Sequence, residues 1–282
     1  MIPAFFAADL HGRLDRYEKL LAAVEAERPA AVLLGGDLLP HGPRPGLEGD
    51  FLRDWLGPRL AALRERAGPR YPLVLAIFGN DDPRAELDSL LALEARGLLR
   101  HAHGRATDVG GVRVYGYACV PPTPFRLKDW ERYDVSRYVD PGCVSPEEGV
   151  FSVPVPEEEA RWGTIASDLE RLVGEDPLAS STLLLHAPPY GTLLDRAALD
   201  GRAVDHAPLD VHVGSVAVRR LVERRQPRLS LHGHVHESAR LTGAWRDAIG
   251  ATVCLSAAHD GDELALVRVD LAAPEGATRE LL

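Results

Sequence analysis

Short apolar runs that alternate with helix-periodic segments constrain the fold of this chain of 282 residues more than any other feature. The runs with the length of buried strands are Ile2–Ala8, Ala31–Leu34 and Leu73–Phe78. Apolar residues at helical spacing predict helices at Leu14–Glu27, Phe51–Leu63 and Leu87–Leu98. Strands that alternate with helices in this way indicate an α/β sheet with helices packed on it.

The alternation returns in the second half of the chain. Predicted helices lie at Thr164–Val173 and Ser215–Arg225, and predicted strands at Val112–Tyr117, Thr182–His186, Leu229–His232, Thr252–Leu255 and Leu264–Val269. Between the two halves, residues 121–163 are rich in proline and glutamate and break the pattern. We interpret them as an insertion without its own core, a candidate lid, within a single domain of residues 1–282. Its aromatic residues either shape a pocket or pack the insertion onto the body: Phe125, Trp130, Tyr133 and Tyr138.

Composition narrows the classes of function. No apolar stretch is long enough to span a membrane, and the N-terminus lacks the basic region of a signal peptide. The three cysteines are scattered and suggest reduced thiols, so we expect a cytoplasmic protein. The formal net charge of −10 disfavours nucleic acid as a partner and favours a small-molecule substrate. The oligomeric state is not readable.

Each of five predicted strands ends at a side chain that can bind a metal ion. The metal-capable residues that follow the strands are Asp9 and His11, then Asp37, then Asn80, then His186, and finally His234 with His236. In open α/β sheets, ligands bind beyond the carboxyl ends of the strands. We therefore expect these side chains to converge on one place.

Each of these stretches also has an ordinary structural interpretation. An Asp-x-His is usually a surface turn, Gly-Gly-Asp often caps a helix, and Gly79-Asn80-Asp81-Asp82 has the composition of a polar turn. Taken alone, His186 is better explained as a hydrogen-bonded core histidine. The ordered set of all five favours a metal site. Residues two apart point to the same side of an extended chain, so each pair can serve one centre, and glycines at 36, 79 and 233 permit close backbone approach.

The ordered motifs D-x-H, G-D, G-N-x-D, H and G-H-x-H resemble those of the calcineurin-like metallophosphoesterase superfamily, from Asp9 to His236. The segments HAPPYGTLLD and VGSVAVRRLVERRQPRLSLHGHVHES are similar to stand-alone cytosolic prokaryotic members. The resemblance implies a four-layer α/β/β/α sandwich around two mixed sheets. It also implies two metal ions, one held by Asp9, His11 and His236, the other by Asn80, His186 and His234, with Asp37 bridging them.

This ligand set implies phosphoester hydrolysis. Oxygen and imidazole donors without thiolate suit Mn²⁺, Fe²⁺ or Fe³⁺, Zn²⁺ and Ni²⁺. Two such cations about 3.5–4 Å apart clamp a phosphoryl group and hold a bridging hydroxide that attacks phosphorus.

The chain departs from the family pattern at Asp81, where the signature usually has histidine, to which protonation of the leaving group is assigned. Two neighbouring cations would lower the pKa of a carboxyl group there, so Asp81 is a poor acid. We therefore expect phosphodiesters to be favoured over monoesters, or another histidine to donate the proton. The candidates are His212, His101 and His103, each of which also fits a surface histidine. Asp82 is a candidate for orienting ligands or for capping the next helix, which Pro83 can begin.

Three other functions remain open: a phosphomonoesterase, a nuclease, or a non-catalytic scaffold with the same fold. A nuclease needs a basic track, and the densest cluster is Arg219, Arg220, Arg224 and Arg225. Glu223 interrupts that cluster, which favours a solvated helix face. A scaffold would be expected to lose ligands, whereas this chain keeps the full set.

Overall fold

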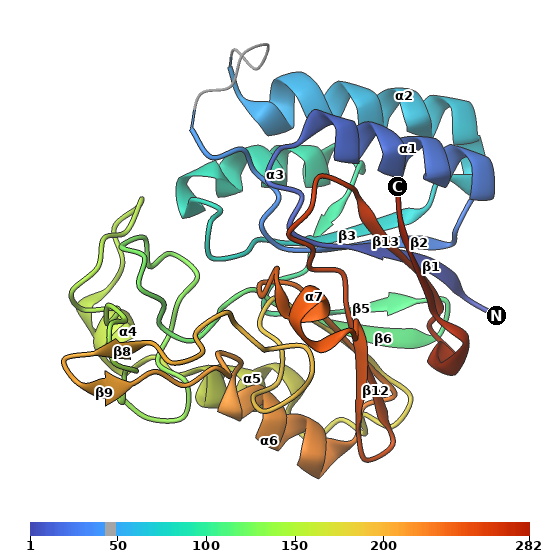
Figure 1. Cartoon of the computed structure of the whole chain (residues 1–282). Helices are drawn as coiled ribbons and strands as arrows, with labels where there is room; N and C mark the ends of the chain where they lie inside the picture. The colour runs from blue at the N-terminus through green and yellow to red at the C-terminus, as the bar shows by residue number, and fades with distance from the viewer. Residues whose placement is uncertain (43–48) are drawn as a thin grey trace.

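The computed structural model describes residues 1–42 and 49–282, and it has two six-stranded mixed sheets (Figure 1). The first sheet consists of β1 (Pro3–Ala7), β2 (Ala31–Gly35), β3 (Leu73–Ile77), β4 (Arg100–His101), β13 (Ala265–Asp270) and β14 (Thr278–Leu281). Their order is β14-β13-β1-β2-β3-β4. Strands β1, β2, β3 and the edge strand β4 are parallel, and β13 runs antiparallel to β1.

The second sheet has the same mixed character. Its strands are β5 (Arg105–Val109), β6 (Val112–Tyr117), β7 (Thr182–Leu185), β10 (Leu229–His232), β11 (Arg246–Ile249) and β12 (Thr252–Ser256), in the order β11-β12-β10-β7-β6-β5. Strands β6, β7, β10 and β12 are parallel, and the two edge strands are antiparallel to their neighbours.

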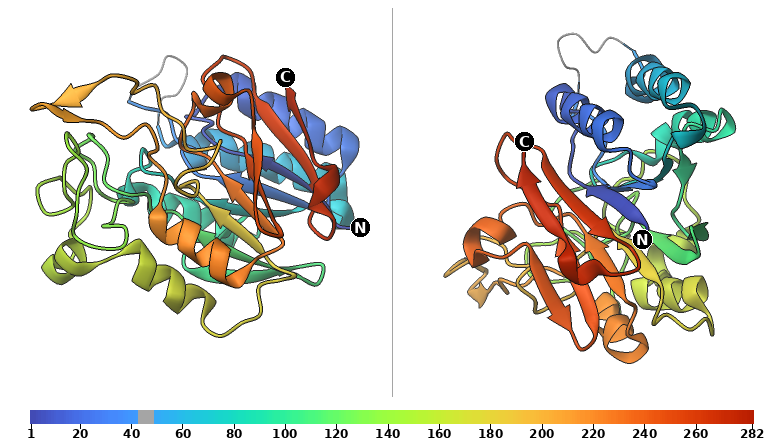
Figure 2. Two further views of the ribbon diagram at one scale, coloured as in Figure 1. Left: turned by 60° about the horizontal axis from the view of Figure 1, so that its bottom comes forward. Right: turned by 90° about the vertical axis from the view of Figure 1, so that its right-hand side faces the viewer.

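Helices cover the outer face of each sheet. Helices α1 (Leu14–Glu27), α2 (Gly57–Ala67) and α3 (Leu87–Ala95) lie on the first sheet, and α5 (Ile165–Val173) and α6 (Val216–Arg225) lie on the second (Figure 2). The predicted four-layer α/β/β/α sandwich is therefore confirmed. Two shorter helices, α4 (Glu157–Trp162) and α7 (Ser238–Thr242), and three 3₁₀ turns at Gly68–Arg70, Arg84–Glu86 and Pro274–Gly276 complete the helical elements of the described residues, apart from the π-helical turn noted below.

Burial explains the strand pattern. Residues of β2 and β7 are buried along their whole length, because parallel strands between two layers face apolar atoms on both sides. Register then aligns the strand ends: Ala7 pairs with Leu34 across β1 and β2, and Gly35 pairs with Ile77 across β2 and β3. The loops that follow these strands consequently begin at the same edge of the sheet.

Two local features differ from the sequence-based expectation. The predicted helix Phe51–Leu63 begins with a π-helical turn at Phe51–Leu56, capped by the Asp50 carboxylate, before α2. Pro83 does not begin a helix; it is extended and precedes the 3₁₀ turn Arg84–Glu86. No described helix is long and apolar enough to cross a membrane.

Residues 121–163 lie beside the small hairpin of β8 (Ala203–Val204) and β9 (Ala207–Pro208), at one end of the molecule (Figures 1 and 2). Some of their aromatic residues pack the insertion onto the body, and others remain exposed and available to shape a pocket. Trp130 and Tyr133 are buried, and Trp130 belongs to the main hydrophobic core. Phe125 and Tyr138 are 59% and 67% exposed.

Candidate metal centre

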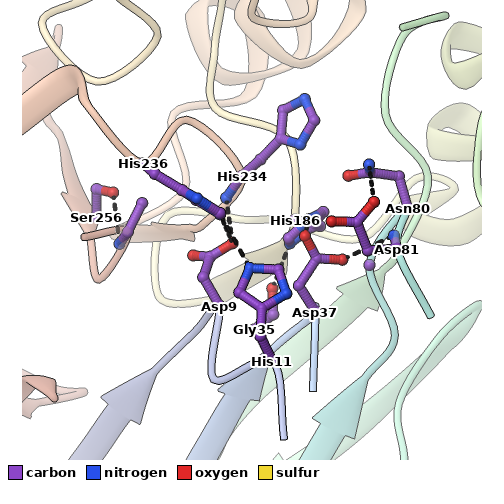
Figure 3. Close-up of polar contacts among 12 residues, drawn as sticks. Asp9, His11, Gly35, Asp37, Asn80, Asp81, His186, His234, His236 and Ser256 are labelled. Carbon is purple, nitrogen blue, oxygen red and sulfur yellow. Dashed lines mark hydrogen bonds and ion pairs between the residues drawn. The ribbon is translucent and has the colours of Figure 1, made fainter. Parts of the chain in front are cut away.

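The residues predicted to bind metal lie together where the central strands of both sheets end (Figure 3). Four of them present donor atoms that all lie within 4.8 Å of one another: Asp9, His11, Asp37 and His236. They come from the loops after β1, β2 and β10, which is the convergence that the aligned strand ends make possible.

The loop conformation is not the extended one that the sequence analysis assumed. Asp9, His11 and His234 have φ values of 56°, 47° and 76°, and Asp37 has 53°. These left-handed residues bend the chain sharply, so the expectation that each pair lies on one side of an extended segment was wrong. Backbone bonds fix the bends: the Asp9 N–H donates to Gly36 O at 2.9 Å and the His11 N–H donates to Asp37 O at 2.8 Å.

Glycine is required where the loops approach the ligand side chains. A Cβ on Gly79 would lie 2.2 Å from Asp37 Oδ1 and 2.5 Å from His186 Nε2. A Cβ on Gly233 would lie 2.7 Å from Asp9 Oδ2. The close approach predicted for these glycines is therefore present.

His186 and His234 lie next to this four-residue cluster, and Asn80 lines the same cavity as Asp37 and His234. His186 Nε2 lies 3.2 Å from Asp37 Oδ2, and its Nδ1 lies 2.8 Å from Gly35 O. A histidine that donates Nδ1–H to a carbonyl keeps Nε2 for a metal ion. The His234 ring lies 5.2 Å from the His186 ring, centre to centre, and the His234 N–H donates to Asp9 Oδ1 at 2.9 Å.

The carboxylates of the centre are held in their ionised form. Burial alone would raise the pKa of Asp37, but attraction to His186 in its protonated form and hydrogen bonds outweigh burial and lower that pKa. A cation bound at His186 Nε2 in place of that proton would act in the same direction. Burial likewise opposes ionisation of Asp9, and its hydrogen bond with His236 lowers the pKa. Burial lowers the pKa of His11 to about 4. Two anionic carboxylates and a neutral imidazole are the forms that bind cations.

Unpartnered oxygen atoms show that these residues fit a cation. Asp9 Oδ2 and the Asn80 side-chain Oδ1 are buried and have no hydrogen-bond partner among the described residues, although both residues are nearly inaccessible to water. Buried acceptors without donors are costly unless something else, such as a metal ion, binds them. The residues present therefore fit the metal ions that the family resemblance implies.

The two acidic residues after Asn80 have different environments. The buried Asp82 carboxylate accepts hydrogen bonds from the N–H groups of Leu38, Leu39 and Gly79, at 2.8–3.0 Å, so it ties the loop after β2 to the loop after β3. Its carboxylate is thus committed to these loops and does not cap the next helix. Asp81 is partly exposed, and its N–H donates to Asp37 Oδ1 at 2.9 Å. Burial, and then the charge of Asp37, raise the pKa of Asp81 to about 6.

Sequence reasoning missed His41. Its Nε2 lies 2.7 Å from His11 Nδ1 and 3.3 Å from Asp81 Oδ2, so these three residues form a second donor cluster at the rim of the centre. The only signal in the sequence is its position four residues after Asp37 in a polar loop. That signal is weak, because His41 does not directly follow a strand.

A cavity of about 400 Å³ opens above the centre, and Asp37, Asn80 and Asp81 form part of its floor. His212 also lines this cavity, and its Nδ1 lies 2.8 Å from Oδ1 of the buried Asp195. His101 and His103 do not line it. His101 is buried, and the His103 ring packs 4.9 Å from Trp130 and 5.3 Å from Tyr117, so neither is the surface histidine considered above.

Three of the four arginines of α6 are engaged with acidic and carbonyl groups, and the fourth, Arg220, is exposed. Arg219 pairs with Glu223 at 2.6 Å, Arg224 pairs with Glu170, and Arg225 donates to the carbonyl oxygens of Gly174 and Asp176. This is the arrangement of a solvated helix face.

Comparisons with known proteins identify the family and the fold. The sequence profile of the calcineurin-like phosphoesterase family matches residues 2–238. The protein MJ1162 of Methanocaldococcus jannaschii, described as uncharacterized, is 36% identical over 76 residues; the match spans 26% of this chain and 29% of that protein. Two solved structures share the fold at 17% identity, each over 99% of this chain and 98% of the other. One, with a TM-score of 0.55, is TT1561 of Thermus thermophilus, and the other has a TM-score of 0.61. This chain belongs to the calcineurin-like phosphoesterase family, whose members are metal-dependent hydrolases acting on phosphoester bonds.

Proposed function

We propose that this chain hydrolyses small phosphodiesters with two metal ions, in preference to monoesters. The observation that carries the proposal is the set of ligand residues with unpartnered oxygen atoms, Asp9 Oδ2 and Asn80 Oδ1, beneath an open cavity of about 400 Å³. A cavity of this size can accept a small organic phosphoester.

The chain's own residues would hold the two cations in the way that the family motif implies. One cation would be bound by Asp9, His11 and His236, the other by Asn80, His186 and His234, and Asp37 would contact both. When bound, the two cations supply Lewis-acid activation of water and neutralise charge on the phosphoryl group. Mn²⁺, Fe²⁺ or Fe³⁺, Zn²⁺ and Ni²⁺ all suit this donor set. Asp82 is a positioning residue, because its carboxylate fixes the loops that carry Asp37 and Asn80.

The preference for diesters follows from Asp81. Its carboxylate lines the cavity beside Asp37, at the position where the family usually has histidine. A monoester carries one more negative charge than a diester near neutral pH, so Asp81 repels it more strongly. The same substitution removes the expected proton donor, which favours substrates with a good leaving group.

His212 is the residue best placed to donate a proton to the leaving group. It lines the cavity, and its Nδ1 is engaged by Asp195, which leaves Nε2 for a substrate. Asp195 is itself held by the N–H groups of Gly191 and Thr192 at 2.9 and 2.8 Å. A histidine oriented by a buried carboxylate is a recurrent arrangement for acid–base catalysis.

The remaining parts of the chain support a small substrate. Three of the four arginines of α6 are engaged by Glu223, Glu170 and carbonyl groups, which leaves no continuous basic track among the described residues of that helix and argues against a nuclease. Residues 121–125 and the segment before α6 both border the cavity, so we propose that the insertion 121–163 forms a wall or lid of the site within one domain. We also propose that the protein is cytoplasmic and has no membrane partner.

The test compares bis(p-nitrophenyl) phosphate with p-nitrophenyl phosphate in the presence of Mn²⁺. We expect kcat/KM of the wild type to favour the diester, and Asp81→His to shift the ratio toward the monoester by about tenfold or more, because general acid catalysis contributes about 10²–10⁴-fold. His212→Asn should reduce kcat for diesters with alkyl leaving groups far more than for p-nitrophenyl esters, which need no proton. His206→Asn, an exposed histidine outside the cavity, is the control.

Two results would overturn the proposal. A wild type that favours the monoester would contradict the role assigned to Asp81. Bound metal without hydrolysis of either ester would favour the scaffold alternative.

A further inference from the structure

One wall of the cavity above the centre is apolar. Its apolar residues come from the loop after β6 and from the segment before α6: Pro121, Pro122, Pro124, Phe125, Leu199, Leu209 and Val213. Phe125 remains 59% exposed although its ring is large and apolar. A single exposed aromatic ring is ordinary on a surface, but one that borders a catalytic cavity offers apolar area to a ligand.

The loop that carries Phe125 is held in place by a buried ion pair. The side chains of Lys128 and Glu131 are fully inaccessible to water and contact each other. Glu131 accepts the N–H and the Oγ1–H of Thr123 at 2.7 and 2.6 Å, and Lys128 Nζ donates to Thr123 O at 3.0 Å. Thr123 in turn accepts the N–H of Phe125 at 3.1 Å. The wall is therefore preformed, and binding an apolar group against it requires little ordering of the chain.

The charged residues of the same cavity are acidic. Beyond the metal centre, the lining contains Asp140, Asp210 and Glu237, and none of the described lining residues is lysine or arginine. Asp210 accepts the Tyr190 O–H at 2.6 Å and Glu237 accepts the Ala198 N–H at 3.0 Å, so both carboxylates are fixed. The one basic side chain of this lining outside the metal centre is His212, which the proposed function assigns to the leaving group. A negative group on the other ester would therefore face the carboxylates without a basic partner, and the interaction would be repulsive.

We infer that the substrate is a phosphodiester whose ester group beyond the phosphoryl is apolar and carries no negative charge. This inference rests on the proposed function, because it places the phosphoryl group at the metal centre. Aryl or alkyl esters meet the wall of Phe125 and the prolines, and a positively charged group is tolerated beside Asp140 and Asp210. Nucleoside polyphosphates and carboxylated esters are excluded by charge.

The experiment uses three p-nitrophenyl aryl phosphates that differ only at the para position of the second ring: hydrogen, trimethylammonium or carboxylate. With the Mn²⁺-loaded full chain, kcat/KM for the carboxylate should be at least about tenfold below the other two, because one unit charge is repelled by fixed carboxylates nearby. Asp140→Asn should reduce the difference in kcat/KM between the carboxylate diester and the other two several-fold. Phe125→Ala should raise KM for the unsubstituted diester about fivefold or more with little change in kcat, because it removes contact made in ground and transition states alike.

The controls are an exposed acid and an exposed apolar residue outside both the cavity lining and the insertion, Glu25→Gln and Leu281→Ala, which should leave the relative kcat/KM of the three diesters unchanged. Calorimetric binding of phenylphosphonate and 4-carboxyphenylphosphonate provides a readout without turnover. Equal kcat/KM for the three diesters, or equal affinity for the two phosphonates, overturns this inference and leaves the proposed function standing. If no diester is hydrolysed but phenylphosphonate still binds more tightly than 4-carboxyphenylphosphonate, the proposed function fails. The inferred preference of the cavity for an apolar group without negative charge then survives.

Discussion

Individual backbone conformations place the ligand side chains of this protein. Asp9, His11, Asp37 and His234 all have positive φ. Aspartate and histidine are among the residues that adopt this region most readily, yet each such residue costs of order 1 kcal/mol or more. The cost is offset by backbone bonds such as Asp9 N–H to Gly36 O. The sequence predicted which residues meet, because their order follows the strand ends, but spacing alone does not specify φ.

Gly79 provides the residue-scale prediction. Replacing it with alanine would place a Cβ 2.2 Å from Asp37 Oδ1, so the Asp37 carboxylate or the loop after β3 must move. Overpacking of this kind costs about 1–3 kcal/mol. We expect Gly79→Ala to weaken Mn²⁺ binding by at least about tenfold, measured by equilibrium dialysis, because the displaced carboxylate contacts both cations in the proposed arrangement.

Gly276→Ala is the matched control, because a Cβ at Gly276 meets no atom within 4 Å and its φ is not positive. An unchanged Mn²⁺ affinity in Gly79→Ala would show that Asp37 is not where the metal binds.

At the scale of elements, periodicity and run length identified the helices and central strands well. The bounds of α1 and β6 agree with prediction because each has a clear apolar pattern. The two-residue strand β4 and the antiparallel edge strand β11 were not predicted, since short or half-exposed strands carry little pattern. The π-helical turn before α2 was also missed, because it shares the apolar spacing of an α-helix.

His103 tests the packing of β4, β6 and the insertion. Its Nδ1 accepts the Ala118 N–H at 2.9 Å, which requires a neutral ring. Burial, with the positive charges of His101, Arg132 and Arg84, lowers the pKa of His103 to about 3 from 6.5. A folded-state pKa below the unfolded one means that the stabilisation is present above about pH 6.5 and is lost as the pH falls toward 3. Between pH 7 and pH 5 the wild type should lose about 1–2 kcal/mol from this residue.

His103→Asn keeps an acceptor for the Ala118 N–H and cannot titrate in this range, so urea unfolding should show a smaller loss between pH 7 and pH 5. His206→Asn, an exposed histidine, should lose as much as the wild type. If His103→Asn shows the full loss, the pKa of His103 is not lowered by its surroundings in the folded protein.

On the scale of the whole molecule, the centre joins the two sheets. Asp9 and Asp37 follow strands of the first sheet, and His186 and His236 follow strands of the second. The ordered motifs predicted this convergence, because the ends of parallel strands meet at one edge. The position of the cavity wall was not predictable in the same way. Phe125, Leu199 and Val213 come from irregular segments, and their meeting depends on long-range contacts and on local anchors such as the buried pair Lys128 and Glu131.

Because the ligands come from both sheets, metal removal should destabilise the whole molecule. A ligand that binds only the folded state stabilises it by about 2.7 kcal/mol at a concentration of 100 Kd. At about 2.1 cal/mol/K of unfolding entropy per residue, that energy raises the Tm of a chain of 282 residues by about 5 °C, so we expect a shift of that order between EDTA and saturating Mn²⁺ in calorimetry. Asp37→Asn should abolish most of the Tm shift, since Asp37 lies between the two ligand groups.

Glu157→Gln is the control and should retain the whole Tm shift, because this exposed carboxylate is remote from the centre in the described structure. A Tm that is the same in EDTA and Mn²⁺ would mean that the buried oxygens of Asp9 and Asn80 do not bind the metal, and the proposed arrangement of ligands would have to be abandoned.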